Sequence, residues 1–426
     1  MKIVAKHRKM ISNNNSCNNF GTDCKENLIE YPSLIYGLDH ECRALCSQFS
    51  EDLPTRFFVG TQCLKLEENE VHVLEHIDEC NHLAKAIFQH PVGEIWHLIA
   101  FSKKLRHLLS CYSSLDGLRK RNHFTLWEIP IDLEQTISEN ESTLPLNLEK
   151  IIDFDAENFD ENFGQIARLK PDGENELILA LETKLARIDL ETQQSIGQIS
   201  LDHSQDQPKI SNKLAKISTF HWSPHFNSNI VALTTNSNIF ARDLRTSSNA
   251  WTISQAHSQS VRDLDFNSNS QHYVVTCGDD CEVKFWDLRN TSRPALKMLQ
   301  HSHWVWCVRY NQFHDDFVLS SSSDGNVNLL RASSIASQPY GQLIDDELDD
   351  DDDGTLKNLL GSKSKFDQQR SNNVDDGLVR KFEDHADSVY AIEWSPNDPW
   401  IFASLSYDGR LIINRVPEEE KMKFLN

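Results

Sequence analysis

One pattern of residues recurs along the chain at fixed intervals, and it restricts the possible folds more than any other feature. Counted from a histidine, apolar residues follow at 4, 9 and 17 positions, an aspartate at 23, and a strand-like residue at 29. Three copies agree without a gap, which indicates a structural repeat. Their residues are His257, Val261, Phe266, Val274, Asp280 and Trp286; His301, Val305, Tyr310, Val318, Asp324 and Leu330; and His385, Val389, Trp394, Phe402, Asp408 and Asn414.

Weaker copies precede these three, and they start near residues 40, 91, 160 and 213. The copy near 213 keeps Ile217, Trp222 and Ile230 at the expected offsets. The copy near 160 is identified by "LKPDGENELILAL", which aligns with "WSPHFNSNIVALT" in the next copy. The copy near 91 carries its "LWE" (126–128) after an insertion. The sequence therefore predicts seven units.

Each unit contains short apolar runs rich in β-branched residues, separated by turn residues every eight to twelve positions. Examples are "VRDLDF", "YVVTC" and "VKFWDL", which are typical of strands in a meander. Four strands per unit, a histidine near the start and Trp-Asp near the end resemble the WD40 family. The resemblance implies an all-β fold, a seven-bladed WD40 β-propeller spanning 31–417.

The two ends of the repeat region predict how the ring closes. After "RLIINRVP" (410–417) only a charged tail, 418–426, remains, so the last unit lacks a fourth strand. The run "SLIYGL" (33–38) lies before the first copy. We expect strand 33–38 to complete the last blade, with residues 1–30 forming a disordered polar tail.

The cluster "CGDDCEVKFWDLRN" (277–290) could be read as an acid–base pair, Asp279 and Asp280, or as metal ligands Cys277 and Cys281. A structural reading is favoured because Asp280 recurs in other copies, and Asp279 is expected to be a solvated turn residue. The WD40 resemblance implies a hydrogen-bonded set within a blade. Its members would be His257, Thr276, Asp280 and Trp286, with His301, Asp324, His385 and Asp408 as counterparts in the next two copies.

An acidic segment interrupts the sixth unit between its third and fourth strands, at about 332–376. Its run "DDELDDDDD" (345–353) has eight acidic residues in nine positions. Such a composition cannot bury enough apolar surface to fold, so a disordered loop is expected. Asp349, Asp351 and Asp353 before Gly354 resemble an EF-hand start, but position twelve is Leu360 and no flanking helices are apparent.

Composition limits the function. The chain has 42 basic and 64 acidic residues, a net charge of -22, which disfavours a nucleic-acid surface. No common catalytic motif occurs, and the ten cysteines include no CxxC pair. We therefore expect no catalytic residues, no metal and no cofactor. No signal peptide or long apolar run is present, so a cytoplasmic protein without direct membrane insertion is predicted.

Several stretches are more specific than the WD40 pattern. They include "HPVGEIWH" (90–97), "HSHWVWCVRYN" (301–311) and "DSVYAIEWSPNDPWIFASLSYDGRLIINRVP" (387–417). They resemble a family of WD40 partners of the endosome-associated recycling and Golgi-associated retrograde tethering complexes. The resemblance implies a non-catalytic adaptor, located peripherally at the trans-Golgi network and recycling endosomes. It also implies a role in recycling to the plasma membrane and in dense-core vesicle maturation.

Large side chains recur five positions after the start of four copies. Aromatic residues and arginine often anchor protein interfaces, so these positions are candidate partner contacts. The alternative is that they line the centre of the ring or pack between blades. The residues are Trp96, Arg262, Trp306 and Tyr390.

A different function is suggested by two Asp-x-Arg endings, "FARDLR" (240–245) and "FWDLR" (285–289). In some WD40 proteins a WDxR ending marks docking to the adaptor of cullin-four ubiquitin ligases. Arg245 and Arg289 would then contact that adaptor, and the chain would be a substrate receptor. In either case a monomer is expected. The partner subunit and the propeller face that binds it stay open.

Overall fold

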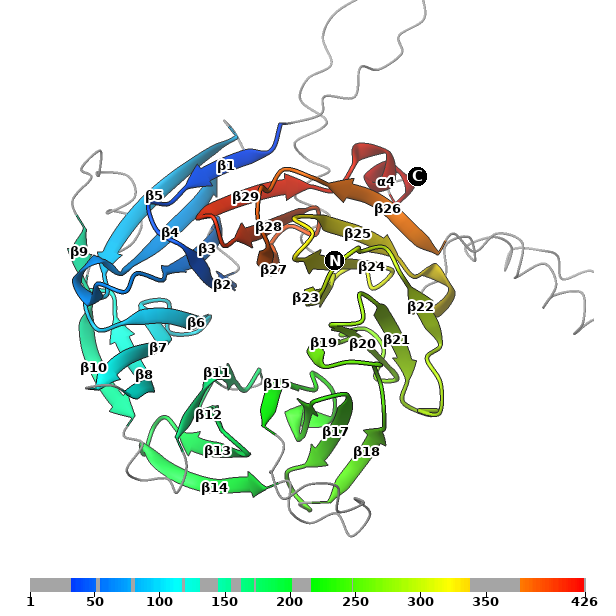
Figure 1. Cartoon of the computed structure of the whole chain (residues 1–426), viewed down its shortest axis with the longest axis horizontal. Coiled ribbons are helices and arrows are strands. Elements are labelled where there is room, and N and C mark those ends of the chain that lie inside the picture. The colour runs from blue at the N-terminus through cyan, green and yellow to red at the C-terminus, as the bar shows by residue number, and fades with distance from the viewer. Residues whose placement is uncertain are drawn as a thin grey trace, which may run out of the picture.

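The fold is a ring of seven sheets, as predicted from the repeat, and all their strand pairs except one in blade one are antiparallel (Figure 1). A computed structural model describes residues 32–50, 54–77, 81–116, 119–130, 145–154, 162–171, 174–200, 216–246, 248–337 and 376–424. The proposed tail 1–30 and most of the acidic loop lie outside these residues. No helix among them is long and apolar enough to cross a bilayer.

Blades one to four follow one another along the chain, each with its first strand innermost (Figure 1). Blade one contains β2 (Cys42–Gln48), β3 (Thr55–Thr61), β4 (Glu70–Ile77), β5 (His82–Gln89) and β9 (Leu146–Asn147). Blade two contains β6 (Glu94–Ala100), β7 (His107–Asp116), β8 (Arg119–Glu128) and β10 (Glu149–Phe154). Blade three contains β11 (Phe163–Leu169), β12 (Glu176–Leu181), β13 (Lys184–Asp189) and β14 (Gln194–Ser200); blade four contains β15 (Ile217–Trp222), β16 (Ile230–Thr235), β17 (Asn238–Asp243) and β18 (Asn249–Ile253).

Blades five to seven complete the ring. Blade five contains β19 (Val261–Phe266), β20 (Tyr273–Gly278), β21 (Val283–Asp287) and β22 (Leu296–Met298). Blade six contains β23 (Val305–Tyr310), β24 (Phe317–Ser322), β25 (Val327–Arg331) and β26 (Gly377–Phe382). Blade seven contains β27 (Val389–Trp394), β28 (Ile401–Ser406) and β29 (Arg410–Arg415), joined by β1 (Leu34–Gly37). Because β25 pairs with β26, the acidic segment connects the third and fourth strands of blade six.

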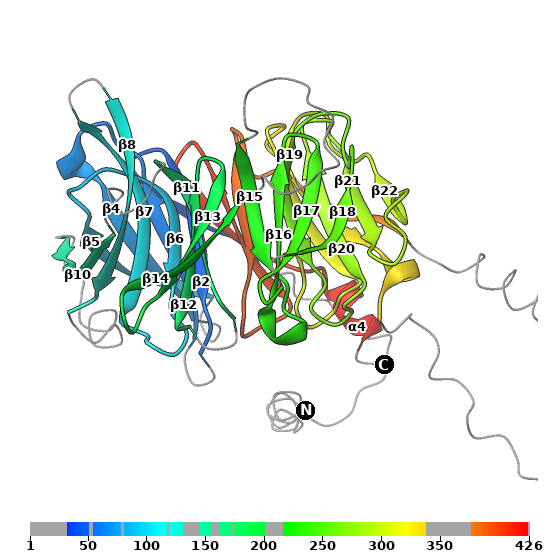
Figure 2. The same cartoon turned by 90° about the horizontal axis from the view of Figure 1, so that it is seen from below.

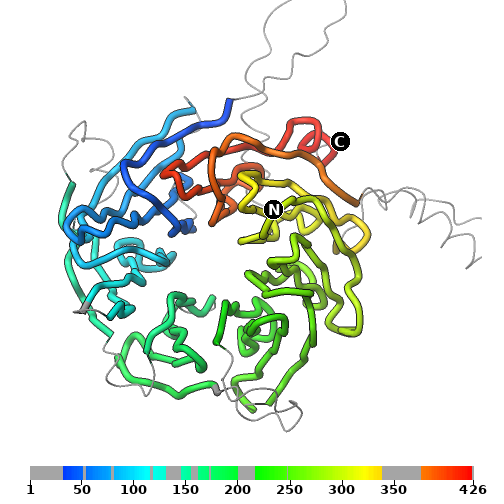
Figure 3. The backbone as a smooth tube through the Cα atoms, viewed as in Figure 1, coloured from blue at the N-terminus to red at the C-terminus, as the bar shows by residue number. Residues whose placement is uncertain are grey.

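The N-terminal strand closes the ring, which confirms the predicted closure. β1 runs antiparallel to β29, with Leu34 opposite Ile413 and Gly37 opposite Arg410. In the backbone trace the blue start and the red end of the chain lie side by side in one blade (Figure 3). Blade seven therefore joins strands from the two ends of the propeller, and its integrity depends on both.

The apolar core is divided among the contacts between neighbouring blades. Within the described residues, seven apolar clusters are found, one at each blade–blade contact. The second strands are covered on both sides, and every residue of β3, β24 and β28 is buried. Each fully buried Phe or Leu side chain contributes about 1.5–3 kcal/mol relative to exposure. Burial on both sides explains why β24 and β28 consist of continuous apolar or small residues, and why β3 does so apart from Arg56.

The ring has two faces, which we define by strand direction. On the upper face, at the top of Figure 2, the innermost strands begin and the second strand of each blade is connected to the third. On the lower face the innermost strands end and the third strand of each blade ends. Side chains that share an offset in the repeat therefore share a face.

Some features differ from the sequence-based expectations. β9 adds a fifth strand to blade one and pairs parallel with β5. Residues 418–426 are not only a charged tail, because α4 (Glu418–Lys423) lies within them. The Phe424 ring after α4 lies 4.5 Å from the His314 ring and 5.7 Å from the Trp400 ring, centroid to centroid. Arg331 also donates to Glu420, so the C-terminal helix is attached to blades six and seven.

Candidate protein-docking surface

Blade five contains the complete hydrogen-bonded set expected from the WD40 pattern. His257 Nδ1 donates to Asp280 Oδ1 (2.7 Å), and the Thr276 hydroxyl donates to His257 Nε2 (2.8 Å). Trp286 Nε1 donates to the same hydroxyl (2.9 Å). Burial lowers the pKa of His257, which keeps the ring neutral and fits this pattern of donors. The cluster around Asp280 is therefore a structural link between the strands of one blade.

Other blades keep parts of this set. In blade six His301 Nε2 bonds the Ser320 hydroxyl (2.9 Å), and Nδ1 lies 3.1 Å from Asp324 Oδ2. Blade two repeats part of the arrangement with residues that the offsets did not identify. Its His90 stands one position before the start of the copy, and its longer β7–β8 hairpin displaces Trp127. There Ser110 Oγ lies 2.9 Å from His90 Nε2 and accepts from Trp127 Nε1 (2.8 Å).

Two of the expected roles are wrong. His385 bonds the Ser404 hydroxyl (2.8 Å), but its buried Nδ1 has no hydrogen-bond partner among the described residues. Asp408 instead accepts from the backbone N–H of Arg410 (3.2 Å), so it does not orient His385. Asp279 is not a solvated turn residue: it is 9% exposed and receives two hydrogen bonds from Arg262, of 2.5 and 2.8 Å.

The four candidate contact residues lie on one face, because each stands near the start of an innermost strand. Trp306 and Tyr390 are in direct contact, with ring centroids 4.9 Å apart, and Arg262 lies over Trp306 at 4.7 Å. Further side chains link them into a continuous set on the upper face, which we call the aromatic arc. Its members are Trp96, Arg43, Tyr390, Tyr407, Trp306, Trp304 and Arg262.

The aromatic arc extends over blades two, one, seven, six and five. At its blade-two end Lys120 lies 4.6 Å from the Trp96 ring centroid and pairs with Glu94. Trp304, which precedes β23, is 41% exposed. In blades three and four the second residue of the innermost strand is small: it is Gly164 in β11 and Ser218 in β15. The arc is therefore confined to five of the seven blades.

Sequence reasoning missed Arg43, Trp304 and Tyr407. The copy near 40 was misaligned by two positions. In blade one Cys42 pairs with Thr61, just as Val261 pairs with Gly278 in blade five, so Cys42 is the counterpart of Val261 and begins β2. His40 is consequently not the counterpart of His257, and Arg43 is the counterpart of Arg262. Tyr407 had a detectable signal, because it stands at offset 22 of its copy, where Asp279 contacts Arg262 in blade five.

The charges below the arc, near the ring centre, compensate one another. Asp263 is buried and accepts from Arg309, whose Nε lies 3.4 Å from Glu393. Burial raises the pKa of Asp263, but Arg309, His221 and Arg168 together lower it more and hold this pKa below its usual range. Nearby, burial raises the pKa of Asp265 to about 7. This network links blades five, six and seven and is internally paired, which indicates a structural role.

The two arginines of the Asp-x-Arg endings lie apart from the arc. They follow the third strands of blades four and five and so stand on the lower face. Arg245 pairs with Asp243 (2.8 Å) and Arg289 with Asp287 (2.7 Å), and their side chains are 66% and 58% exposed. Each arginine thus contacts the aspartate of its own motif while most of its side chain faces solvent.

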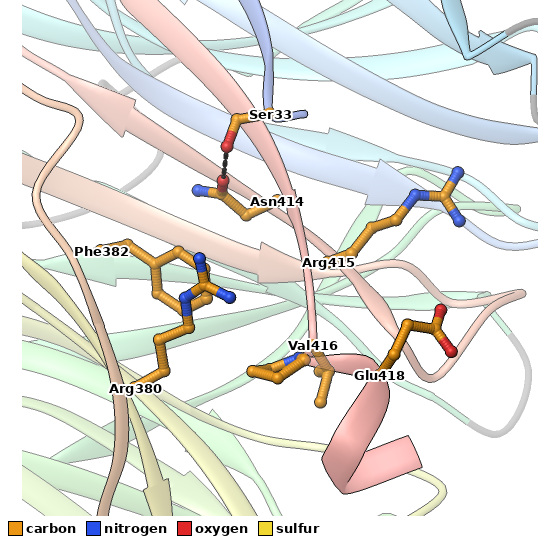
Figure 4. Close-up of a pocket in the computed structure, with 8 residues that line it drawn as sticks. Ser33, Arg380, Phe382, Asn414, Arg415, Val416 and Glu418 are labelled. Atoms are coloured by element: carbon orange, nitrogen blue, oxygen red, sulfur yellow. Dashed lines mark hydrogen bonds between the residues drawn. The ribbon is translucent and has the colours of Figure 1, made fainter. Parts of the chain in front are cut away.

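Two further features are small. A pocket lies where β26, β29 and the start of α4 meet (Figure 4). At this pocket the Ser33 hydroxyl donates to Asn414 Oδ1 (2.6 Å), which attaches the chain before β1 to β29. On blade one, ligand-type atoms of His40, Cys63 and Glu68 lie within 4.8 Å of one another. Glu68 is also paired with Lys65 (2.7 Å), so this cluster is partly neutralised.

Comparison with known proteins agrees with this architecture. A model described as the EIPR1 beta-propeller matches residues 31–330, and a WD domain, G-beta repeat model matches 377–413. The chain is 40% identical to the EARP-interacting protein homolog of Gekko japonicus and 37% identical to EARP and GARP complex-interacting protein 1 of Homo sapiens; both alignments cover 92% of this chain and 98% of the relative. EARP-interacting protein 1 of Caenorhabditis elegans is 32% identical over 391 residues. The chain thus belongs to the family of EARP and GARP complex-interacting proteins.

Proposed function

We propose that this chain is a non-catalytic WD40 adaptor that binds EARP and GARP tethering complexes through the aromatic arc. The arc supports this role because it gathers three contacts between tryptophan and tyrosine rings on one face of a protein whose relatives are named for an interaction. Large aromatic and arginine side chains carry most of the binding energy at protein interfaces. In this proposal the protein is a cytoplasmic monomer, recruited peripherally to the trans-Golgi network and recycling endosomes. It supports recycling to the plasma membrane and dense-core vesicle maturation.

The test is affinity purification of the full chain from cells with a double variant, Trp306→Ala with Tyr390→Ala. We expect EARP and GARP subunits to co-purify with the wild type and to be lost with the variant, because losing two hot-spot side chains weakens binding by about 30-fold or more. The matched control is Phe226→Ala with Phe313→Ala, two exposed aromatics (55% and 40%) in first-to-second strand loops of the lower face. Circular dichroism must show that both double variants fold. Equal loss in the control, or retention in the arc variant, would contradict the proposal.

A second candidate is a substrate receptor of a cullin-four ubiquitin ligase. It is favoured by one observation, the exposed Arg245 and Arg289 side chains on the lower face. Arg289→Asp separates the two candidates in the same experiment, because it leaves the arc unchanged. Recovery of the ligase adaptor as the main partner, lost with Arg289→Asp alone, would favour the receptor function.

A further inference from the structure

Arg43 of blade one is held among three aromatic rings that come from the two neighbouring blades, two and seven. Its guanidinium carbon lies 3.9 Å from the Tyr390 ring centroid, 5.2 Å from that of Tyr407 and 5.3 Å from that of Trp96. Such contacts attract a cation through the negative face of the ring and fix the plane of the guanidinium. Arg43 stands on β2 of blade one, midway along the aromatic arc, so its position is set by the neighbouring blades rather than by its own loop.

Arg43 differs from the other cations of the arc in having no acidic partner among the described residues. Arg262 is paired with Asp279, and Lys120 is paired with Glu94. Arg43 has no ion pair there, and its Nε is buried without a hydrogen-bond acceptor. The nearby Glu41 carboxylate accepts from the Tyr407 hydroxyl (3.1 Å). One cation of the arc is thus fixed in place, half-buried and uncompensated.

We propose that Arg43 is a carboxylate-binding residue, and that it takes an aspartate or glutamate side chain of the tethering-complex segment that docks on the arc. This inference rests on the proposed function and adds the chemistry of the partner. The planar guanidinium fork matches a carboxylate with two parallel hydrogen bonds. The rings around it exclude water, which strengthens the ion pair. A chain with a net charge of -22 repels acidic segments elsewhere, so an uncompensated arginine fixes where such a segment can bind.

The experiment measures the dissociation constant between the purified full chain and a purified EARP complex at several salt concentrations. The variants are Arg43→Met, which keeps an unbranched apolar stem without the charged guanidinium, and Arg43→Lys. We expect Arg43→Met to weaken binding by about tenfold or more and to flatten the salt dependence, because an ion pair is lost. The affinity of Arg43→Lys should lie between those of the wild type and Arg43→Met, because lysine keeps the charge but not the planar guanidinium fork. Arg293→Met, an exposed arginine between β21 and β22, is the control for the loss of one positive charge.

The outcomes are distinct. Absence of wild-type binding overturns both this inference and the proposed function. Wild-type binding that Arg43→Met changes by less than about twofold overturns this inference alone, and so does a loss shared equally by Arg293→Met. If both Arg43 variants have a lower thermal midpoint and the salt dependence of binding is unchanged, Arg43 has a purely structural role and the inference is overturned. Tighter binding by Arg43→Met would also overturn the inference, because it would indicate that the chain's own acidic run 345–353 occupies Arg43.

Discussion

At the residue scale, Thr276 is the shared acceptor and donor of the hydrogen-bonded set in blade five. Thr276→Val keeps the shape of the side chain but leaves His257 Nε2 and Trp286 Nε1 without a partner in a buried site. We expect the free energy of unfolding to fall by about 1–3 kcal/mol, measured by urea titration. Thr252→Val on β18, whose hydroxyl has no hydrogen bond among the described residues, is the matched control. A loss no larger than that of the control would contradict the structural role of the set.

Also at the residue scale, His90 makes stability depend on pH. It is fully buried, and burial lowers its pKa to about 4 from an ordinary 6.5. Below pH 6.5 the unfolded chain binds a proton that folded His90 does not, so this contribution to stability is lost as the pH falls from 6.5 towards 4. The loss is about 2 kcal/mol at pH 5.

The measurement is urea unfolding of the wild type and of His90→Gln at pH 7 and pH 5. The variant should lose less stability between these pH values than the wild type, whereas His82→Gln, at an exposed position of β5, should behave as the wild type. The comparison must be between variants, because Asp265, with its pKa raised to about 7, acts in the opposite direction over this range. Identical pH dependence in His90→Gln and the wild type would contradict the prediction.

At the element scale, β1 is a single short strand with a large effect, because it covers the edge of β29 and packs Leu34 and Tyr36 against the cluster shared by blades seven and one. Removal of residues 1–38 should lower the thermal midpoint and promote association through the exposed strand edge. Removal of residues 1–31, which leaves β1 in place, is the control. Equal thermal midpoints and equal monomer fractions by size-exclusion chromatography would show that the closure is dispensable.

At the scale of the whole molecule, the ring brings together residues that are far apart in the chain. Arg43 and Tyr390 are separated by most of the sequence, yet the guanidinium carbon lies over the Tyr390 ring because blades one and seven are neighbours. The same closure extends the arc to Trp96. The predicted loss of tethering-complex binding in the arc variants, and the predicted effect of Arg43→Met, therefore depend on an intact ring, so both require variants shown to fold.

The sequence by itself determined the fold class, the number of blades and the strand that closes the ring, because these follow from local periodicity and from the missing strand of the last unit. It also identified the set around Asp280, because the histidine and the aspartate recur at fixed offsets and the WD40 resemblance implied the other two members. Only the tertiary structure decided which side chains gather on the upper face. Arg43 was missed because its copy was counted from His40, which is not the counterpart of His257 and shifts every offset by two. Asp279 was misjudged because its partner lies on another strand. Contacts across blades depend on how blades pack, and local patterns do not record that.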